Sequence, residues 1–324
     1  MRRGIILRKS PSGTVKNFSS PKGEGFQPSP KGTLNSVHGI HSGYYMDINI
    51  LKKNIEKFLH EDIGSGDLTS EATLPPDQTG TAEFIAKESF VVCGIETIAP
   101  LVFTTQNPAI EIIKACKDKT QASPGDVLLI AKGPVLDLLK AERAALNIVQ
   151  RLSGIATFTA MFVEKVKPLP VRILDTRKTT PGLRMLEKYA VRAGGGYNHR
   201  FNLADGILIK DNHIQACGSI KNAVARMREK IPHTMKIEVE ASSLDQVREC
   251  ISCSVDIIML DNMEPGMMRE AVKFAGNKAL LEASGGINLD NVREVADTGV
   301  DYISIGALTH SAPACDISMR LISA

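Results

Sequence analysis

The chain has 324 residues, and its 39 Lys and Arg against 36 Asp and Glu give a formal charge of +3. That length allows one large or two ordinary domains with a sizeable core, and the near balance of charge excludes the basic surface typical of nucleic-acid binding. The 6 cysteines are scattered without the spacing of a disulfide framework, which predicts a reducing, cytoplasmic location.

Residues 1–45 differ in composition from the rest of the chain. They hold 7 Lys or Arg and a single acid, Glu24, and they are rich in Ser, Gly and Pro without apolar periodicity. Such a segment cannot bury enough apolar surface to order itself, so we predict a disordered extension before a candidate ancestral start at Met46. A transit peptide is the alternative, although the segment has no amphipathic stretch. Since no apolar run reaches the roughly 18 residues of a membrane span, we expect no membrane association.

The next part of the chain predicts a helix and a small sheet. Apolar residues recur at helical spacing over residues 48–60, which indicates an amphipathic helix. The following EDIGSGDLTS has the composition of a calcium loop but lacks the spacing of an EF-hand, so a structural turn is the better interpretation. Short Val, Ile and Phe runs bounded by turn residues then predict strands within residues 81–96, 109–118 and 125–133.

A second helix is predicted over residues 135–153. Its apolar residues, among them Val135, Leu138 and Leu152, recur at helical spacing and should pack inward. The opposite face carries Arg143, Asn147 and Gln150, which by default would lie in solvent.

After residue 170 the chain repeats a unit of one short apolar strand followed by a helical stretch. The predicted strands are VRIL, GILIK, MKIEVE, DIIML, ALLEAS and DYISIG. Near-continuous apolar strands that alternate with helices indicate a parallel sheet covered on its outside, and six such units favour a nearly closed barrel with fewer than eight strands. The lone Cys250-x-x-Cys253 pair has no second pair nearby, which favours incidental thiols over zinc or redox chemistry.

The strands of this predicted barrel end in polar residues. In parallel barrels the catalytic groups come from the carboxyl ends of the strands, so this set favours an enzyme. The strand-end residues are Asp175, Lys210, Glu240, Asp261, Ser284 and Gly306. Any one of them could be explained by a strand that simply ends at water, but the whole set is poorly explained in that way.

Cations gather between residues 174 and 214. Arg177 and Lys178 follow the strand VRIL and precede a turn, a context that favours a binding role for a small polyanion. Three more basic residues, Arg184, Lys188 and Arg192, lie three to four residues apart, and we interpret them as the solvent face of a helix. Two Gly-bearing loops, SGGI and GALTHS, follow the last two strands, and their backbone N–H groups are suited to a phosphate.

Seven runs of the sequence resemble the quinolinate phosphoribosyltransferase family: AERAALNIVQRLSGIAT, DTRKTTPGLR, NHRFNLADGILIKDNHI, IEVE, LDN, SGGI and GALTHS. The resemblance extends from about residue 50 to the end. It implies the transfer of ribose 5-phosphate from phosphoribosyl pyrophosphate to quinolinate with decarboxylation, giving nicotinate mononucleotide, pyrophosphate and CO2 in NAD biosynthesis. The family requires Mg²⁺ and no organic cofactor.

The resemblance also implies the type II phosphoribosyltransferase architecture. This is an α/β fold with an N-terminal α/β sandwich over residues 46–155, completed by about residues 309–324, and an incomplete α/β barrel over residues 156–308 that carries the active site. The family forms homodimers in which the sandwich of one chain covers the barrel of its partner, and a hexamer of dimers is a further possibility.

Site residues carry over from the family by motif. Arg177, His199 and Arg200 would hold the carboxylates of quinolinate, with Arg143 supplied by the neighbouring subunit. Lys178 and Lys210 would lie on the phosphoribosyl pyrophosphate side, with Lys210 near both ligands, and Thr176 is a further substrate-binding residue. The family's phosphate-binding loops correspond to Ser284, Gly285, Gly286, Gly306 and His310. Glu240 and Asp261 would serve the ribose hydroxyls, Mg²⁺ or the developing ribose cation, and the sequence leaves these three roles open. Lys178, Lys210, Glu240 and Asp261 are the predicted catalytic set.

Two other functions compete with this interpretation. A nicotinate-type phosphoribosyltransferase or a molybdenum-linked relative could share the barrel, and a non-catalytic module could bind a phosphate ligand. The complete TRKTTPGLR and NHR runs favour a dicarboxylate substrate, and acids placed opposite the cations argue against a simple binder.

Overall fold

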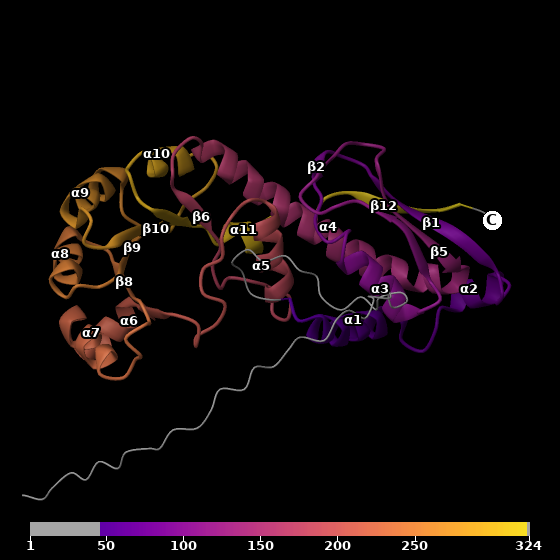
Figure 1. Ribbon diagram of the computed structural model, residues 1–324, viewed down its shortest axis with the longest axis horizontal. Helices are drawn as coiled ribbons and strands as arrows, with labels where there is room; N and C mark the ends of the chain where they lie inside the picture. Colours follow the sequence, from indigo (N-terminus) through magenta and orange to yellow (C-terminus); the bar gives the residue numbers. More distant parts are fainter. Residues whose placement is uncertain (1–45, 323–324) are drawn as a thin grey trace, which may run out of the picture. The chain divides into compact units, whose positions relative to one another are not determined.

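The computed structural model describes residues 46–322, which all belong to one compact unit. The extension predicted over residues 1–45 lies outside the described residues. The described chain contains a four-stranded antiparallel sheet, a six-stranded parallel sheet and a two-stranded pair (Figure 1).

The antiparallel sheet has the strand order β12-β1-β5-β3. Its strands are β1 (Thr79–Ala86), β3 (Glu111–Ala115), β5 (Val127–Pro134) and β12 (Ile317–Ile322), and the short pair consists of β2 (Phe90–Val91) and β4 (Gln121–Ala122). Every second residue of β1 is buried, including Phe84, because alternate side chains of a strand point to opposite faces. The strands predicted in this region are therefore confirmed.

Helices cover the buried face of this sheet. They are α1 (Ile48–Ile63), α2 (Leu68–Thr73), α3 (Ile98–Gln106) and the N-terminal half of α4 (Val135–Val166). The first helix is confirmed and runs three residues beyond the predicted end at residue 60, into the predicted loop, where Asp67 caps α2 through its side chain. The last strand, β12, comes from the end of the chain and pairs with β1 over six residue pairs.

Helix α4 is 32 residues long and connects the two sheets. It contacts β5, β2 and β12 along one part and β6 and α5 along another, so it runs through the predicted domain boundary at residue 155 without a break. The length and composition of α4 would suit a membrane span, although the sequence was expected to contain no apolar run long enough for one. Half of its most apolar stretch is buried inside the protein, as in the core helix of a soluble protein, so this resemblance to a span is weak.

The parallel sheet has the strand order β6-β11-β10-β9-β8-β7. Its strands are β6 (Arg172–Leu174), β7 (Ile207–Ile209), β8 (Ile237–Ala241), β9 (Ile257–Asp261), β10 (Leu280–Ser284) and β11 (Tyr302–Ser304). All five pairings are parallel. Its outer side is covered by α7 (Ile220–Arg228), α8 (Leu244–Ser252), α9 (Pro265–Ala275) and α10 (Val292–Ala296), as Figure 1 shows. This is the predicted incomplete barrel.

The barrel lacks a pairing between β6 and β7, its two edge strands. The chain between them forms α5 (Arg184–Ala193) and then the segment 194–206, which we call the seam loop. Tyr197 in this loop makes an isolated parallel bridge with Leu174 of β6. The seam loop therefore occupies the edge where the missing strands of a complete barrel would begin.

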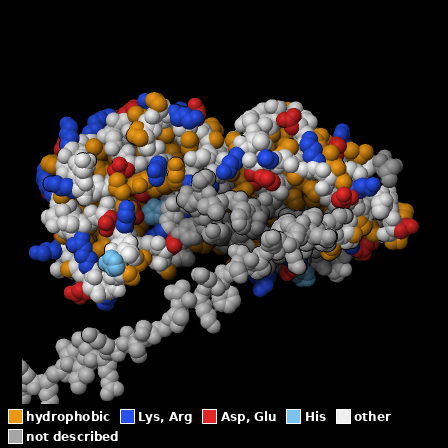
Figure 2. Space-filling model, in the orientation of Figure 1, with side chains coloured by type: hydrophobic (Ala, Val, Ile, Leu, Met, Phe, Trp, Pro, Cys, Tyr) orange, Lys and Arg blue, Asp and Glu red, His pale blue; other side chains and the backbone are white. Residues whose placement is uncertain are grey.

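Acidic and basic side chains are interspersed over the face of the molecule that Figure 2 shows. This distribution agrees with the near-zero net charge and leaves nucleic acid without a basic stripe to bind on that face.

Candidate active site

Thirteen of the fourteen predicted site residues line one cavity of about 620 Å³ at the carboxyl ends of the barrel strands. They are Thr176, Arg177, Lys178, His199, Arg200, Lys210, Glu240, Asp261, Ser284, Gly285, Gly286, Gly306 and His310. Residues separated by more than 130 positions in the sequence converge here because parallel strands end at the same edge of the sheet. We call this cavity the barrel cavity.

Two guanidinium groups lie on one side of the barrel cavity. The Nε of Arg177 is buried and has no hydrogen-bond partner among residues 46–322, so a donor is available for a ligand. Arg200 donates from Nη1 to the carbonyl of Gly206 at 2.9 Å. Burial and the neighbouring charge of Arg177 lower the pKa of Arg200, since each disfavours a further cation. Two cations held this close favour an anionic ligand.

Lys210 and Glu240 form an ion pair between the ends of β7 and β8. The Glu240 side chain is 13% exposed and that of Lys210 is 43% exposed, so the cation faces the open part of the cavity. Asp261 ends β9, and its side chain makes no hydrogen bond or ion pair with any other described residue. The cavity therefore holds one neutralised acid and one that is available to a hydroxyl or a metal.

The loop carrying Arg177 and Lys178 is held from below by buried polar groups. Glu187 of α5 is fully buried and accepts from the Thr180 N–H at 3.0 Å and from Arg151 Nε at 2.8 Å. Arg151 of α4 also donates from Nη2 to Glu187 Oε1 at 2.5 Å and to the Thr309 carbonyl at 2.8 Å. Thr309 Oγ1 in turn donates to the Lys178 carbonyl at 2.8 Å. The position of the loop thus depends on an ion pair between α4 and α5.

The interpretation of Arg184, Lys188 and Arg192 as a solvent face is wrong. Lys188 is 2% exposed and forms a buried ion pair with Asp175, and it donates to the His199 carbonyl at 2.9 Å. Arg184 donates to Thr179 Oγ1 at 2.8 Å and to the Phe201 carbonyl at 3.1 Å, whereas Arg192 donates to the Gly196 carbonyl at 3.0 Å. The polar face of α5 therefore supports the two cation-bearing loops.

The buried pair beneath these loops is electrostatically costly on its own. Burial raises the pKa of Asp175 and lowers the pKa of Lys188, and the partner's charge opposes each shift. Asp175 also accepts from the N–H of His199 at 2.9 Å and from Asn198 Nδ2 at 2.6 Å. Asp175 follows a strand end, but it is fully buried and both of its carboxylate oxygens accept hydrogen bonds from within the protein, so its role is to fix the seam loop.

The two Gly-bearing loops, SGGI and GALTHS, border the barrel cavity, and the backbone of each loop lies close to a neighbouring side chain. Gly285 has φ +95°, and a Cβ there would lie 2.2 Å from Asn262 Oδ1, so only glycine fits. A Cβ at Gly306 would lie 2.8 Å from Cδ of Lys178. GALTHS leads directly into the four-residue helix α11 (Ala307–His310), but SGGI does not lead into a helix, because α10 begins only at Val292.

Two buried acids that sequence reasoning missed lie beneath the barrel cavity. Glu238 of β8 and Glu282 of β10 are 5% and 2% exposed, and both point into the barrel, one inward position below the strand ends. His199 Nε2 lies 3.2 Å from Glu238 Oε2 and 3.6 Å from Glu282 Oε1. An acid within the otherwise apolar runs IEVE and LLEAS was the only signal in the sequence.

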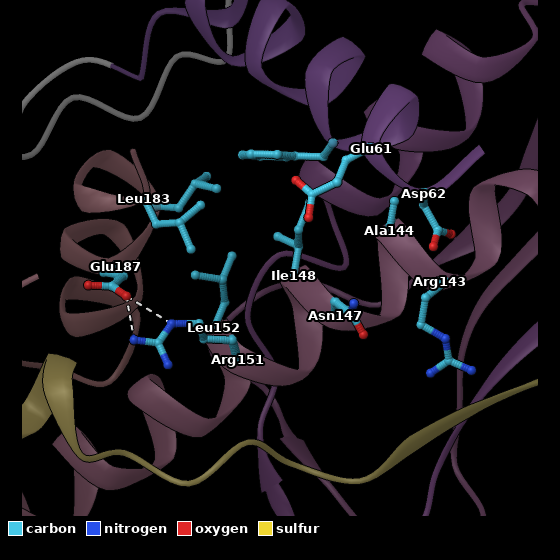
Figure 3. Close-up of a pocket in the computed structure, with 12 residues that line it drawn as sticks. Glu61, Asp62, Arg143, Ala144, Asn147, Ile148, Arg151, Leu152, Leu183 and Glu187 are labelled. Atoms are coloured by element: carbon cyan, nitrogen blue, oxygen red, sulfur yellow. Dashed lines mark hydrogen bonds and ion pairs between the residues drawn. The ribbon is translucent and has the colours of Figure 1, made fainter. Parts of the chain in front are cut away.

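Arg143 is the one predicted site residue outside the barrel cavity. It is exposed on α4 and lines a separate cavity of about 370 Å³ formed by α1, α4 and α5, together with Asn147, Glu61 and Leu183. In Figure 3 its guanidinium points away from the Arg151–Glu187 pair, and it makes no ion pair with any residue that the structure describes. Gln150, predicted on the same polar face, instead donates to the Ile317 carbonyl at 2.8 Å.

The fold and the cavity together define an α/β-barrel protein that binds an anionic small molecule at the carboxyl ends of its strands. Comparison with known proteins is more specific. Residues 67–153 match the N-terminal domain of quinolinate phosphoribosyl transferase, and residues 155–320 match its C-terminal domain. The chain belongs to the quinolinate phosphoribosyltransferase family.

Relatives of known sequence and structure agree with this assignment. The chain is 48% identical to the probable nicotinate-nucleotide pyrophosphorylase (carboxylating) of Bacillus subtilis, over 83% of this chain and 92% of that protein. The crystal structure of NadC from Streptococcus pyogenes has a TM-score of 0.82 at 40% identity and covers 87% of this chain and 99% of that chain. A human nicotinic acid phosphoribosyltransferase, at 12% identity and a TM-score of 0.54, shares the fold alone.

Proposed function

We propose that the chain transfers ribose 5-phosphate from phosphoribosyl pyrophosphate to the ring nitrogen of quinolinate and releases pyrophosphate and CO2, forming nicotinate mononucleotide for NAD biosynthesis. Family membership gives this activity, and one observation in the structure supports it most strongly. The barrel cavity brings together two Arg side chains, two Lys side chains and two carboxylates from four strand ends and the seam loop. A dianionic ring and a polyphosphate need such a mixture.

The Arg side of the barrel cavity suits the two carboxylates of quinolinate. A dianion leaving water needs several charge-assisted hydrogen bonds, and a guanidinium can donate two parallel bonds to one carboxylate. The unpartnered Nε of Arg177 and the remaining donors of Arg200 are available for this purpose. His199 lies beside them, although its Nε2 is directed to Glu238 and its Nδ1 accepts from the Arg200 N–H at 2.7 Å.

The Lys side suits phosphoribosyl pyrophosphate. Lys178 and Lys210 would bind phosphate oxygens, with backbone N–H groups of Gly285, Gly286 and Gly306 around the sugar phosphate. Asp261, with its free carboxylate, is the acid that fits Mg²⁺, a cation that proteins usually bind through one or two carboxylates plus substrate phosphates. Glu240 is held by Lys210 and would face the ribose. When bound, Mg²⁺ would neutralise charge that develops on the departing pyrophosphate.

The chemistry follows from charge placement, without a nucleophilic side chain. Lys178 and Lys210 would stabilise the leaving pyrophosphate, and the fixed carboxylates of Glu240 and Asp261 would stabilise positive charge on the ribose carbon. Arg177 and Arg200 would hold the ring nitrogen in line with that carbon. Once ribosylated, the ring nitrogen is cationic and accepts the electron pair left when the adjacent carboxylate departs as CO2.

The active site is completed in this proposal by a homodimer in the cytoplasm, with Arg143 of one chain entering the barrel cavity of its partner. The exposure of Arg143 and its lack of a partner among the described residues support this arrangement, because an Arg with no intrachain role is free to bind a substrate across an interface. The cavity around Arg143 in Figure 3, with apolar walls from Ile148 and Leu183, would then receive part of the partner.

A substrate assay tests the proposed function. Pyrophosphate release is measured with phosphoribosyl pyrophosphate and Mg²⁺ plus quinolinate, nicotinate or no acceptor. We expect release with quinolinate alone, because nicotinate lacks the second carboxylate that the Arg pair would hold. Release with nicotinate at a similar kcat/KM would instead support a nicotinate-type enzyme, and tight binding of both ligands without release would support a non-catalytic module.

A further inference from the structure

The cluster of His199, Glu238 and Glu282 beneath the barrel cavity has no role in the reaction as described above. Its side-chain atoms lie within 4.8 Å of one another, and the three residues come from the seam loop, β8 and β10. Oε1 of Glu238 and Oε1 of Glu282 are buried without a hydrogen-bond partner among the described residues. Unpartnered buried carboxylate oxygens are costly unless something positive reaches them.

The hydrogen bonds of His199 indicate what that positive species is. Its Nδ1 accepts the backbone N–H of Arg200 at 2.7 Å, so Nδ1 carries no proton. A neutral imidazole must then carry its proton on Nε2, which faces Glu238 at 3.2 Å. Metal binding through Nε2 would require the opposite tautomer, with a proton on Nδ1 directed at the Arg200 N–H. The geometry therefore favours a proton over a metal ion at the carboxylates.

We propose that Glu282 is a positioning residue for the dicarboxylate substrate, and that its ionised form takes up a proton when the dianion enters the barrel cavity above it. The proposal rests on the proposed function. His199 lines the barrel cavity and its Nε2 lies 3.6 Å from Glu282 Oε1, so its ring connects the substrate site with Glu282. Without that proton, two buried carboxylates would repel the two carboxylates of quinolinate across one imidazole.

The charges around Glu282 leave it balanced between its two states. Burial, together with the charge of Glu238, raises the pKa of Glu282 to about 7. The charged or titratable groups around the cluster on the neighbouring elements include Asp175, Lys188, Arg200, Asp205, Glu240, Arg172, Lys236 and Tyr302. The cations and acids around Glu282 already offset one another. The added negative charge of a bound dianion therefore decides whether Glu282 is protonated or ionised.

Calorimetry tests the proposal. Quinolinate is titrated into the full-length protein at pH 7 in buffers of different ionisation enthalpy, which gives the number of protons taken up on binding. We expect roughly half a proton for the wild type, because about half of Glu282 is ionised in the free protein at this pH. Glu282→Gln should bind quinolinate with almost no proton uptake, whereas the matched surface variant Glu270→Gln should behave like the wild type.

The pH dependence of binding gives a second readout. The Kd of the wild type for quinolinate should rise roughly fivefold from pH 7 to pH 8, and that of Glu282→Gln should stay nearly constant, since its side chain is neutral throughout. If Glu282→Gln does not fold, Glu238→Gln serves instead. Removing the charge of Glu238 lowers the pKa of Glu282, so more of Glu282 is ionised in the free protein at pH 7 and the proton uptake on binding should rise above that of the wild type.

Failure of the inference can be told apart from failure of the proposed function. A wild type that turns over quinolinate but takes up no proton on binding it, or a Glu282→Gln variant with undiminished uptake, overturns the role of Glu282. An equimolar transition metal in the purified wild type that Glu282→Gln lacks overturns it as well. A wild type with no turnover of quinolinate at all contradicts the proposed function.

Discussion

Glu187→Gln should uncouple the loop carrying Arg177 and Lys178 from its support. Glu187 is fully buried and accepts three hydrogen bonds, two from Arg151 and one from the Thr180 N–H. Gln keeps the shape but loses the charge, and its amide group must oppose one of these donors. Breaking a buried ion pair by removing one partner costs roughly 3–5 kcal/mol. Because the Arg151 side chain is 30% exposed and water can reach it, we expect a loss of about 3 kcal/mol in the free energy of unfolding.

Urea denaturation and steady-state kinetics measure this effect. The KM for quinolinate should rise, because Thr180 lies at the end of the loop that carries Arg177. Glu164→Gln is the matched control, since Glu164 pairs with Lys167 at the surface and should cost less than about 0.5 kcal/mol. A double-mutant cycle with Arg151→Met should give a coupling energy of about 2 kcal/mol. If Glu187→Gln unfolds like the wild type and keeps its KM, the loop does not depend on this ion pair.

Three further predictions concern the substrate, the buried acid and the dimer. Arg177→Ala should weaken quinolinate binding by about 2 kcal/mol or more, as expected for a lost charge-assisted pair, and phosphoribosyl pyrophosphate binding far less; equal weakening in calorimetry would refute the dicarboxylate role. The pKa of Glu282 is about 7 in the folded protein against an ordinary 4.5, so the folded state binds more protons than the unfolded state between these two pH values. The contribution of Glu282 to stability therefore falls as pH rises from about 4.5 to 7. Glu282→Gln should therefore gain about 2.5 kcal/mol relative to the wild type between pH 5 and pH 8 in denaturant titrations, and a constant difference would contradict the buried acid. Arg143→Ala and Lys210→Ala chains, each inactive alone, are mixed at equal ratio, unfolded and reassembled. If the site is shared, the mixture should recover about a quarter of wild-type activity, because half of the dimers are mixed and each mixed dimer has one intact site. No recovery, with heterodimers confirmed by mass spectrometry, would place the site within one chain.

The strand ends could be predicted from the sequence because two simple rules apply to them. Short apolar runs that alternate with helices indicate a parallel barrel, and the residue that ends each run must then lie at one edge. Lys210, Glu240, Asp261 and Ser284 meet in the barrel cavity for this reason. The seam loop has no strand or helix pattern of its own, so its site residues could be predicted only from the long motifs that resemble the family.

The supports of the site could not be predicted by the same rules. Arg184, Lys188 and Arg192 have the spacing of a solvated helix face. The sequence gives no sign that the two cation-bearing loops cover that face. Glu238 and Glu282 are hidden within apolar strands, where a single acid carries no local pattern. The ion pair of Lys188 and the contacts of both buried acids join segments more than ten residues apart, whereas periodicity reports only on neighbours within one element.

The most direct test of the proposed function follows the carboxyl group itself. Quinolinate labelled with ¹³C in the 2-carboxylate is incubated with phosphoribosyl pyrophosphate, Mg²⁺ and the full-length protein, and the products are measured by mass spectrometry. We predict equal amounts of ¹³CO2, pyrophosphate and unlabelled nicotinate mononucleotide. A nucleotide product that retains the ¹³C label, or pyrophosphate released without labelled CO2, would contradict the proposed reaction.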